Sequence, residues 1–175
     1  MEVALNERLR KIGIFSTALS EPGAVDLLIS ILKPRSFHAG TILFSEGDEG
    51  SEMFILHKGR VRIRKNTPSG EQYTVVLLDE GQNAFFGEVG LLESESRSAT
   101  VIAETNVECF VINKDDFLDF SNKNPRIGLL ITREIAKELS QRLRKSSHDL
   151  VTLFTALVSE IEGETNPQPS SSEQE

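Results

Sequence analysis

Between Ser36 and Lys114 the sequence consists of short runs in which apolar or β-branched residues recur at strand-like spacing. The runs are SFHAGTILF, SEMFILHKGRVRIRK, EQYTVVLLDEG, SATVIAET and VECFVINK. Turn-forming residues separate them, at Asp48-Glu49-Gly50, Pro68-Ser69-Gly70 and Glu80-Gly81. Several short strands with frequent turns favour a β-roll or barrel over a parallel sheet. The pattern therefore predicts a mainly β domain over residues 36–117.

Helical periodicity precedes this domain. We expect two helices in residues 1–35, because apolar residues recur at helical spacing on two faces. The faces are Val3, Leu5, Leu9, Ile12 and Ile14 in the first helix, and Ala24, Leu27, Leu28, Ile31 and Leu32 in the second. Pro22 is tolerated in a first helical turn, and Pro34 is expected to end the second helix.

A helical pattern also follows the β domain, in residues 118–161. Asn124-Pro125 is a plausible helix start, after a hinge near Phe117. Apolar residues then recur at Ile127, Ile131, Ile135, Leu139, Leu143, Leu150, Phe154, Leu157 and Ile161, with heptad spacing in the later part. A helix of roughly 35 residues, about 50 Å long, is too long for one small β domain to cover. We expect it to pair with a partner helix and to form a homodimer.

Composition limits the function classes. The formal net charge is −8, and four of the acids lie in residues 162–175, which we expect to be a disordered acidic tail. The remaining 23 acids and 19 bases give −4, so a DNA-binding surface is not expected. No apolar run approaches the roughly 18 residues of a membrane span, and no signal peptide is evident. The single Cys109 has no intrachain disulfide partner, so we expect a cytoplasmic protein without membrane contact.

The stretch FGEVGLLESESRSAT, from Phe86 to Thr100, combines groups that suit a ligand with a phosphate and a ribose. Gly87 permits close approach of the backbone or a positive φ. Val89–Leu92 is long enough for one helical turn, and Arg97 offers a charged, planar fork of donors. Glu88 suits sugar hydroxyls, as acidic residues do in dinucleotide sites. The alternatives are a surface ion pair of Arg97 with Glu93 or Glu95, and a helix-capping role for Glu88.

This stretch resembles the phosphate-binding cassette of the cyclic nucleotide-binding domain, found in catabolite-activator-type regulators, protein kinase A regulatory subunits and nucleotide-gated channels. Phe44-Ser45-Glu46-Gly47-Asp48, followed by Met53-Phe54-Ile55-Leu56 and Gly59, resembles the first β-roll signature of that family. The resemblance implies an α+β fold with a mainly β core. This core is an antiparallel β-roll of the double-stranded β-helix or jelly-roll kind, flanked by N-terminal helices and a long C-terminal dimerisation helix.

The resemblance also implies residue roles. Glu88 takes the ribose 2′-hydroxyl and Arg97 the cyclic phosphate, and the nucleotide-binding set is Gly87, Glu88, Val89, Arg97, Ser98, Ala99 and Thr100. Contacts to the base or lid are placed at Val75, Arg142 and Ser146. The alternative for Arg142 and Ser146 is that they lie on solvated faces of the helix. Serine after the cassette arginine favours cAMP over cGMP. One departure is the loop between Gly81 and Phe86, which is longer than the family pattern.

Enzymatic signatures are not evident. His38, His57 and His148 are isolated in the sequence, without metal-ligand spacing, and no nucleophile elbow or P-loop is present. We therefore expect no catalytic residue, no metal and no cofactor other than the nucleotide ligand.

Three hypotheses remain. The leading one is a stand-alone cyclic nucleotide receptor that rearranges its C-terminal helix and acts on an unknown effector protein. If the chain is complete, it lacks the helix-turn-helix of catabolite-activator-type regulators. The second hypothesis is a dimerising interaction module that has lost ligand control. The third is a regulatory domain excised from a larger channel, kinase or transcription factor.

Overall fold

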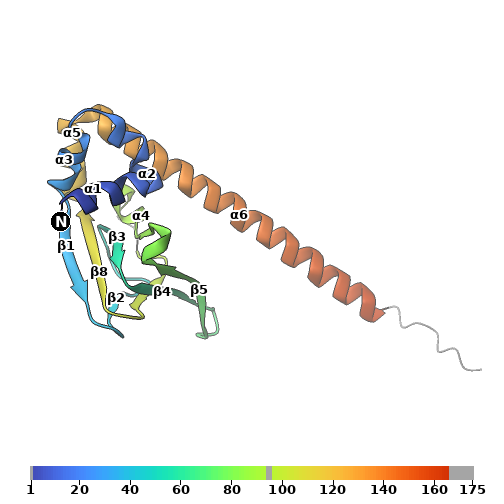
Figure 1. Cartoon of the computed structure of the whole chain (residues 1–175). Coiled ribbons are helices and arrows are strands. Elements are labelled where there is room, and N and C mark those ends of the chain that lie inside the picture. Colours follow the sequence, from blue (N-terminus) through green and yellow to red (C-terminus); the bar gives the residue numbers. More distant parts are fainter. Residues whose placement is uncertain (1, 94–95, 166–175) are drawn as a thin grey trace, which may run out of the picture. The chain divides into compact units, whose positions relative to one another are not determined.

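The computed structural model describes residues 2–93 and 96–165 (Figure 1). The helical elements are α1 (Glu2–Lys11), α2 (Gly13–Ser16), η1 (Ala18–Ser20), α3 (Ala24–Ile29), η2 (Glu80–Gln82), α4 (Val89–Leu92), α5 (Lys114–Lys123) and α6 (Pro125–Thr165). The strands are β1 (Lys33–Phe37), β2 (Ile42–Phe44), β3 (Glu52–Lys58), β4 (Arg60–Asn66), β5 (Gln72–Asp79), β6 (Phe85–Phe86), β7 (Thr100–Ala103) and β8 (Val107–Asn113). The chain divides into two compact units, Met1–Ile135 and Ala136–Glu175.

The strands of the first unit form two four-stranded antiparallel sheets. One sheet has the order β1-β8-β3-β6 and the other the order β2-β7-β4-β5. Each of the five alternating runs in the sequence supplies at least one of these strands. The predicted fold class, an antiparallel β-roll with flanking helices, is confirmed.

The core of the β-roll draws on strands of both sheets. Its buried members are Phe54, Leu56, Val61, Phe86, Val101, Ala103, Val107, Cys109 and Val111. The Phe54 and Phe86 rings stack with their centroids 5.3 Å apart, and the Phe44 ring lies 5.6 Å from that of Phe54. Burial raises the pKa of the Cys109 thiol to about 12, which agrees with an inert core cysteine.

The prediction of two helices within residues 1–35, the second ended by Pro34, was wrong in its detail. Ile12 has extended backbone angles and Gly13 follows it, so the first helix ends at Lys11 and a short second helix starts afresh. The last N-terminal helix ends at Ile29, and Pro34 already belongs to β1. Because β1 is an edge strand, the missing N–H of proline is tolerated there.

The long C-terminal helix begins at Pro125, as predicted, and runs for 41 residues. The predicted segment 118–161 is shared between the two units, since Ile127, Ile131 and Ile135 are buried within the first. The predicted disordered tail began at residue 162, but the helix continues to Thr165. The rest of that prediction, residues 166–175, lies outside the described residues.

Candidate functional site: a buried arginine in a glycine cradle

The backbone around Gly87 forms the tight turn that the sequence predicted. Gly87 has a φ of +75°, the left-handed conformation that glycine adopts readily. The amide of Gly90 donates to the Gly87 carbonyl at 3.1 Å, and the amide of Leu91 donates to the Glu88 carbonyl at 3.1 Å. The single helical turn predicted at Val89–Leu92 is α4, which is confirmed.

Arg97 is turned inward rather than toward solvent. It is 8% exposed, and its Nη1 donates to the Glu52 carbonyl at 2.7 Å and to the Gly87 carbonyl at 3.4 Å. Its Cζ lies 4.2 Å from the centroid of the Phe44 ring, close enough for a cation–π interaction. The alternative of a surface ion pair with Glu93 is not supported, because the guanidinium is buried against backbone and ring atoms, and Glu95 lies outside the described residues.

Three glycines form a cradle for this guanidinium, which we call the glycine cradle: Gly50, Gly87 and Gly90. A Cβ at Gly50 would lie 2.0 Å from Arg97 Nε, and one at Gly87 would lie 2.7 Å from Nη1. A Cβ at Gly90 would lie 3.2 Å from Nη1 and 2.8 Å from the Gly50 carbonyl oxygen. The inward position of Arg97 thus requires that these side chains be absent.

The electrostatics of Arg97 leave it incompletely satisfied. Burial lowers the pKa of Arg97, while the negative charges of Glu52, Asp48 and Glu88 act in the opposite direction. The Nε atom is buried and has no hydrogen-bond partner among the described residues. An unsatisfied buried donor costs about 1–3 kcal/mol, more when it belongs to a charged group. An anionic acceptor at Nε would remove this cost.

The second half of the cassette is joined to the first β-roll signature through backbone pairing. The amide of Arg97 donates to the Asp48 carbonyl at 2.8 Å, and the amide of Gly47 donates to the Arg97 carbonyl at 2.9 Å. The Thr100 hydroxyl accepts from the Glu46 amide at 2.9 Å. Two segments about fifty residues apart in sequence therefore meet around one guanidinium.

The remaining predicted cassette residues differ in exposure. Glu88 is 4% exposed, and its side chain makes no cap hydrogen bond to α4, so the helix-capping alternative is not supported. Ala99 and Thr100 are buried, Val89 is half-buried and Ser98 is exposed. The structure thus brings Glu88, Arg97, Ala99 and Thr100 into a buried setting and leaves the Ser98 side chain open to solvent.

The three predicted base or lid residues do not belong to one unit. Val75 lies on β5, the edge strand of its sheet, and is 51% exposed. Arg142 and Ser146 lie in the second unit, where both are exposed, and Arg142 Nε pairs with Glu138 at 3.2 Å.

The longer loop before the cassette has a defined structure. Asp79 caps η2, where its side chain accepts from the Gly81 amide, and Asn83 follows in the left-handed conformation with a φ of +50°. The Ala84 carbonyl then accepts from the Leu56 amide at 3.0 Å, and Phe85 and Phe86 pair with β3. The extra residues therefore form a capped turn and a short strand that the sequence did not predict.

Sequence reasoning missed Gly50, Gly90, Glu52 and Phe44 as parts of the arginine site. Phe44 was visible as part of the β-roll signature and Gly50 as a turn residue, but neither signal pointed to Arg97. Their roles arise from the pairing of segments that are distant in the sequence.

The described part of the chain has neither a metal-binding cluster nor a membrane-spanning helix. Within residues 2–93 and 96–165, no group of three or more His, Cys, Asp or Glu side chains is placed to bind a metal ion. Within the same residues, no helix has both the length and the apolar character needed to cross a bilayer.

The site is thus part of a β-roll that buries an arginine and a glutamate between two glycine-containing segments. Residues 34–124, more than half of the 175, match the family model of the cyclic nucleotide-binding domain. The chain belongs to this family. This confirms the resemblance seen in the sequence.

Individual relatives share this domain. The cyclic AMP receptor protein of Thermus thermophilus is 30% identical over 129 residues, which cover 74% of this chain and 57% of the receptor. The cGMP-dependent protein kinase 2 of Homo sapiens is 37% identical over 92 residues, 51% of this chain and 12% of the kinase. The crystal structure of the Thermus thermophilus catabolite activator protein superposes with a TM-score of 0.68 at 29% identity, covering 76% of this chain and 60% of that one. The chain therefore spans about three fifths of the length of these bacterial relatives.

Proposed function

We propose that this protein is a cyclic nucleotide receptor in which Arg97 binds the cyclic phosphate and Glu88 the ribose 2′-hydroxyl. The observation that carries the proposal is the buried Arg97 guanidinium, whose Nε lacks a partner among the described residues. Gly87, Val89, Ser98, Ala99 and Thr100 complete the proposed binding set.

The ligand chemistry follows from the charges around Arg97. Burial opposes the charged guanidinium, and an anion beside it offsets that cost. A cyclic phosphate supplies one negative charge together with oxygen acceptors for the donor fork. Glu88 would repel a bare phosphate but accepts hydrogen bonds from a sugar hydroxyl, so the pair selects a ribose phosphate over inorganic phosphate.

We propose cAMP as the preferred ligand and cGMP as the alternative. Ser98 favours cAMP by the family pattern, and its exposed side chain is free to turn toward a ligand. One relative is named as a cyclic AMP receptor and another as a cGMP-dependent kinase, so both nucleotides have to be tested as ligands. Val75, Arg142 and Ser146 stay the proposed contacts of the base or lid.

The proposed response runs from α4 through α5 to α6. Residues of α4 contact α5, and α5 passes into α6 at Asn124, whose amide donates to the Phe120 carbonyl at 2.9 Å. Gly128 lies so close to Ser121 that a Cβ there would be 2.6 Å from the serine Cβ. A shift of the cassette on binding would thus reach α6, provided that the ligand binds one helix arrangement more tightly.

The proposed output is an altered contact with an effector protein, made by a homodimer that associates through α6. Leu143, Leu150 and Leu157, spaced seven residues apart on α6, are all exposed in the single chain. The competing proposal is a dimerising module without ligand control. The buried Arg97 and Glu88 weigh against it, because a purely structural β-roll gains nothing from two desolvated charges.

The test is isothermal titration of the full chain, stripped of nucleotide, with cAMP and separately with cGMP. Arg97→Ala should weaken binding by about 2–4 kcal/mol, roughly thirtyfold to a thousandfold. Arg97→Lys keeps a positive charge but loses the planar fork of donors, so its nucleotide affinity should lie between those of the parent and of Arg97→Ala. Arg126→Ala, at an exposed ion pair with Glu21, is the control and should bind as the parent does. A folded, empty chain that gives no heat with either nucleotide would favour the ligand-independent module.

A further inference from the structure

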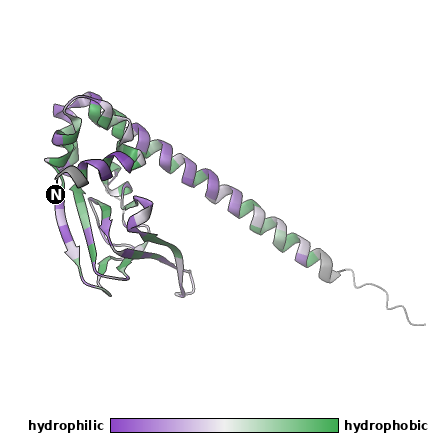
Figure 2. Cartoon of the chain, in the orientation of Figure 1, coloured by the Kyte–Doolittle hydropathy of each residue, from purple (hydrophilic) through white to green (hydrophobic). Residues whose placement is uncertain are grey.

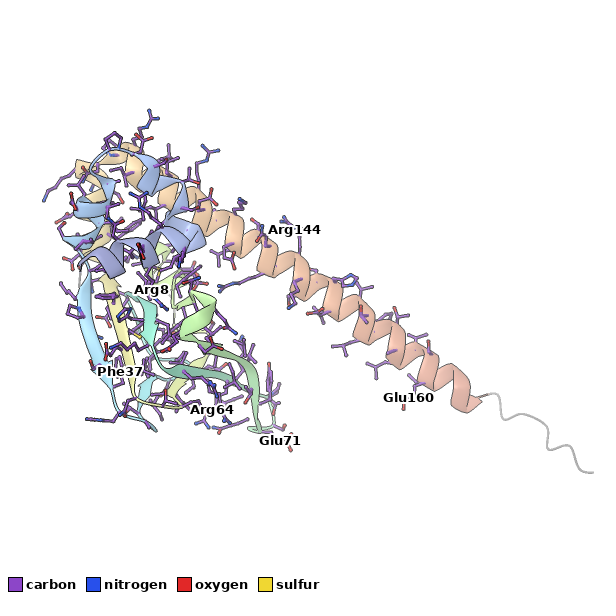
Figure 3. All side chains as sticks on the ribbon, in the orientation of Figure 1. Arg8, Phe37, Arg64, Glu71, Arg144 and Glu160 are labelled. Carbon is purple, nitrogen blue, oxygen red and sulfur yellow. The ribbon has the colours of Figure 1, made fainter. Side chains whose placement is uncertain are left out.

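The second unit contains a helical segment, Leu150–Ile161, whose large apolar side chains are open to solvent. They are between 58% and 68% exposed in the single chain, with Val158 half-buried: Leu150, Val151, Leu153, Phe154, Leu157 and Ile161. Figure 2 shows the change along α6, from mainly hydrophilic residues in its middle to hydrophobic and neutral ones toward its C-terminal end. Two labelled residues in Figure 3 mark its position: Arg144 precedes the segment, and Glu160 is its next-to-last residue.

The apolar face of this segment is wider than a two-stranded coiled coil requires. Phe154 and Ile161 occupy a positions of a heptad, and Leu150 and Leu157 occupy d positions. At 100° per residue these a and d positions cover about 60° of the helix circumference. Val151 and Leu153 extend the apolar arc to about 160°, because they occupy the flanking e and g positions.

The flanking positions distinguish the possible assemblies. In two-stranded coiled coils the e and g positions are often Glu or Lys, which form pairs at the rim of the seam. A helix with apolar residues at a and d plus e or g is typical of a bundle, in which each helix has more than one neighbour. In this segment both e positions, Val151 and Val158, are apolar. Of the two g positions, Leu153 is apolar and Glu160 is charged. A single partner helix would therefore leave an apolar flank in water.

Most of the segment carries no charge that would resist close association of identical chains, and the one charged residue is Glu160, at a g position near its end. Between Leu150 and Ser159 there is no Asp, Glu, Lys or Arg, although the chain as a whole has a net charge of −8. The hydroxyls of Thr152, Thr155 and Ser159 each donate to the carbonyl four residues earlier in α6, at 3.0, 2.9 and 3.0 Å. Their donors are satisfied within the helix.

A membrane surface fits this segment less well. Helices that lie in a bilayer interface carry Lys or Arg on their polar face, opposite the apolar one. Here the polar residues are threonine, serine, alanine and Glu160, and the basic residues of the second unit precede the segment, at Lys137, Arg142, Arg144 and Lys145.

We infer that Leu150–Ile161 associates with three further copies of itself, so that four chains form a helical bundle. After dimers, tetramers built from paired dimers are among the commonest closed homo-oligomers. The a and d seam accounts for the pairing of two chains through α6, and the Val151 and Leu153 flanks join two such pairs. The inference extends the proposed dimer and does not depend on nucleotide binding.

The test is the molar mass of the full chain, by light scattering after size exclusion and by sedimentation equilibrium at several concentrations. Four copies of the 19.4 kDa chain give a mass of about 78 kDa. The double variant Val151→Glu, Leu153→Glu should lower it to that of two copies, about 39 kDa. Thr152→Glu, between them on the polar face, is the matched control and should keep the parent mass.

A seam variant, Phe154→Glu with Leu157→Glu, should give the mass of one chain. Far-ultraviolet circular dichroism of each variant checks that the β-roll is still folded. A parent mass of two copies at every concentration would overturn the bundle while leaving the proposed dimer intact, and a parent mass of one copy would overturn both. Neither result would alter the titration with nucleotide, so failure of the bundle is separable from failure of the receptor.

Discussion

The two units of this chain treat the same kind of side chain in opposite ways. Phe54 in the β-roll is 2% exposed and stacks on Phe86, whereas Phe154 in the second unit is 68% exposed. Both lie in segments whose apolar residues indicated regular secondary structure, a contiguous run at Met53–Leu56 in β3 and heptad spacing in α6. The difference teaches that periodicity marks an apolar face but does not say whether the chain itself covers it. The first unit buries its core within one chain, whereas the second leaves its apolar face exposed in the single chain.

The largest expected effect is a direct test of this contrast. Phe54→Ala should lower the free energy of unfolding by about 3–5 kcal/mol, because it leaves a cavity between the sheets. Phe154→Ala should change the unfolding of the dilute monomeric chain by no more than about 0.5 kcal/mol. Its effect should appear instead as a lower assembled mass at higher concentration.

Urea unfolding, monitored by circular dichroism at low and high protein concentration, measures both quantities. The Phe54→Ala deficit should be the same at the two concentrations, and the Phe154→Ala deficit should grow with concentration. A Phe154→Ala loss that is large and independent of concentration would contradict the division between the units.

The second prediction concerns closure of the arginine site within one chain. Gly87→Ala should cost about 2–4 kcal/mol of stability, because a positive φ strains alanine and its Cβ would lie 2.7 Å from Arg97 Nη1 and 2.9 Å from the Glu52 carbonyl oxygen. Gly70→Ala is the matched control, since Gly70 has a φ of +86° but open space around it. It should cost only about 1 kcal/mol, the strain alone.

Thermal unfolding of the two variants checks this difference. The excess cost of Gly87→Ala over Gly70→Ala isolates the close contact with Arg97 and Glu52. Equal costs for the two substitutions would mean that the arginine yields freely and that the glycine cradle does not hold it.

The third prediction concerns Gly50, whose φ is not positive but whose added Cβ would lie nearest to Arg97 of the three glycines in the cradle. A Cβ there would lie 2.0 Å from Arg97 Nε, so Gly50→Ala should displace the guanidinium and cost about 1–3 kcal/mol. Nucleotide affinity should fall with it, if Arg97 binds the phosphate from its present position. Gly13→Ala, with nothing within 4 Å, is the control and should be neutral or slightly stabilising. Titration and thermal unfolding of both variants provide the measurement, and a stable Gly50→Ala chain with parent affinity would refute the prediction.

Local features were predictable from the sequence because they depend on neighbouring residues. The strands from Ser36 onward, the single turn of α4, the left-handed Gly87 and the helix start at Pro125 all follow from spacing and from the chemistry of glycine and proline. The interruption after Lys11 was not predicted, because the apolar spacing continues through Gly13 although the helix does not.

Long-range features were not predictable from the sequence. The contact of Gly50 with Arg97 arises only when the segment before β3 pairs with the segment before β7, and nothing in the local pattern selects this register. The bond from Arg97 to the Glu52 carbonyl is of the same kind, since a backbone acceptor has no residue-specific signal. The ligand roles of the cassette came from the family resemblance, and the structure adds the burial of Arg97 and an Nε that has no hydrogen-bond partner among the described residues.

The smallest expected effect is a pH dependence that belongs to the first unit. His57 on β3 packs against the Phe110 ring at 5.2 Å, and its Nδ1 is buried without a hydrogen-bond partner among the described residues. Burial first, and then the positive charge of Arg8, lower the pKa of His57 below 6.5.

As the pH falls, the unfolded chain therefore takes up a proton on His57 before the folded chain does, and the stability of the fold decreases. This stability is fully present above pH 6.5 and is lost as the pH drops toward the folded pKa. Urea unfolding at neutral and mildly acidic pH should show a smaller decline for His57→Gln than for the parent, while the exposed His38→Gln keeps the parent decline. The same decline in all three chains would show that His57 is solvated enough to protonate freely in the fold, and the β-roll would then be less completely closed around β3 than its buried neighbours indicate.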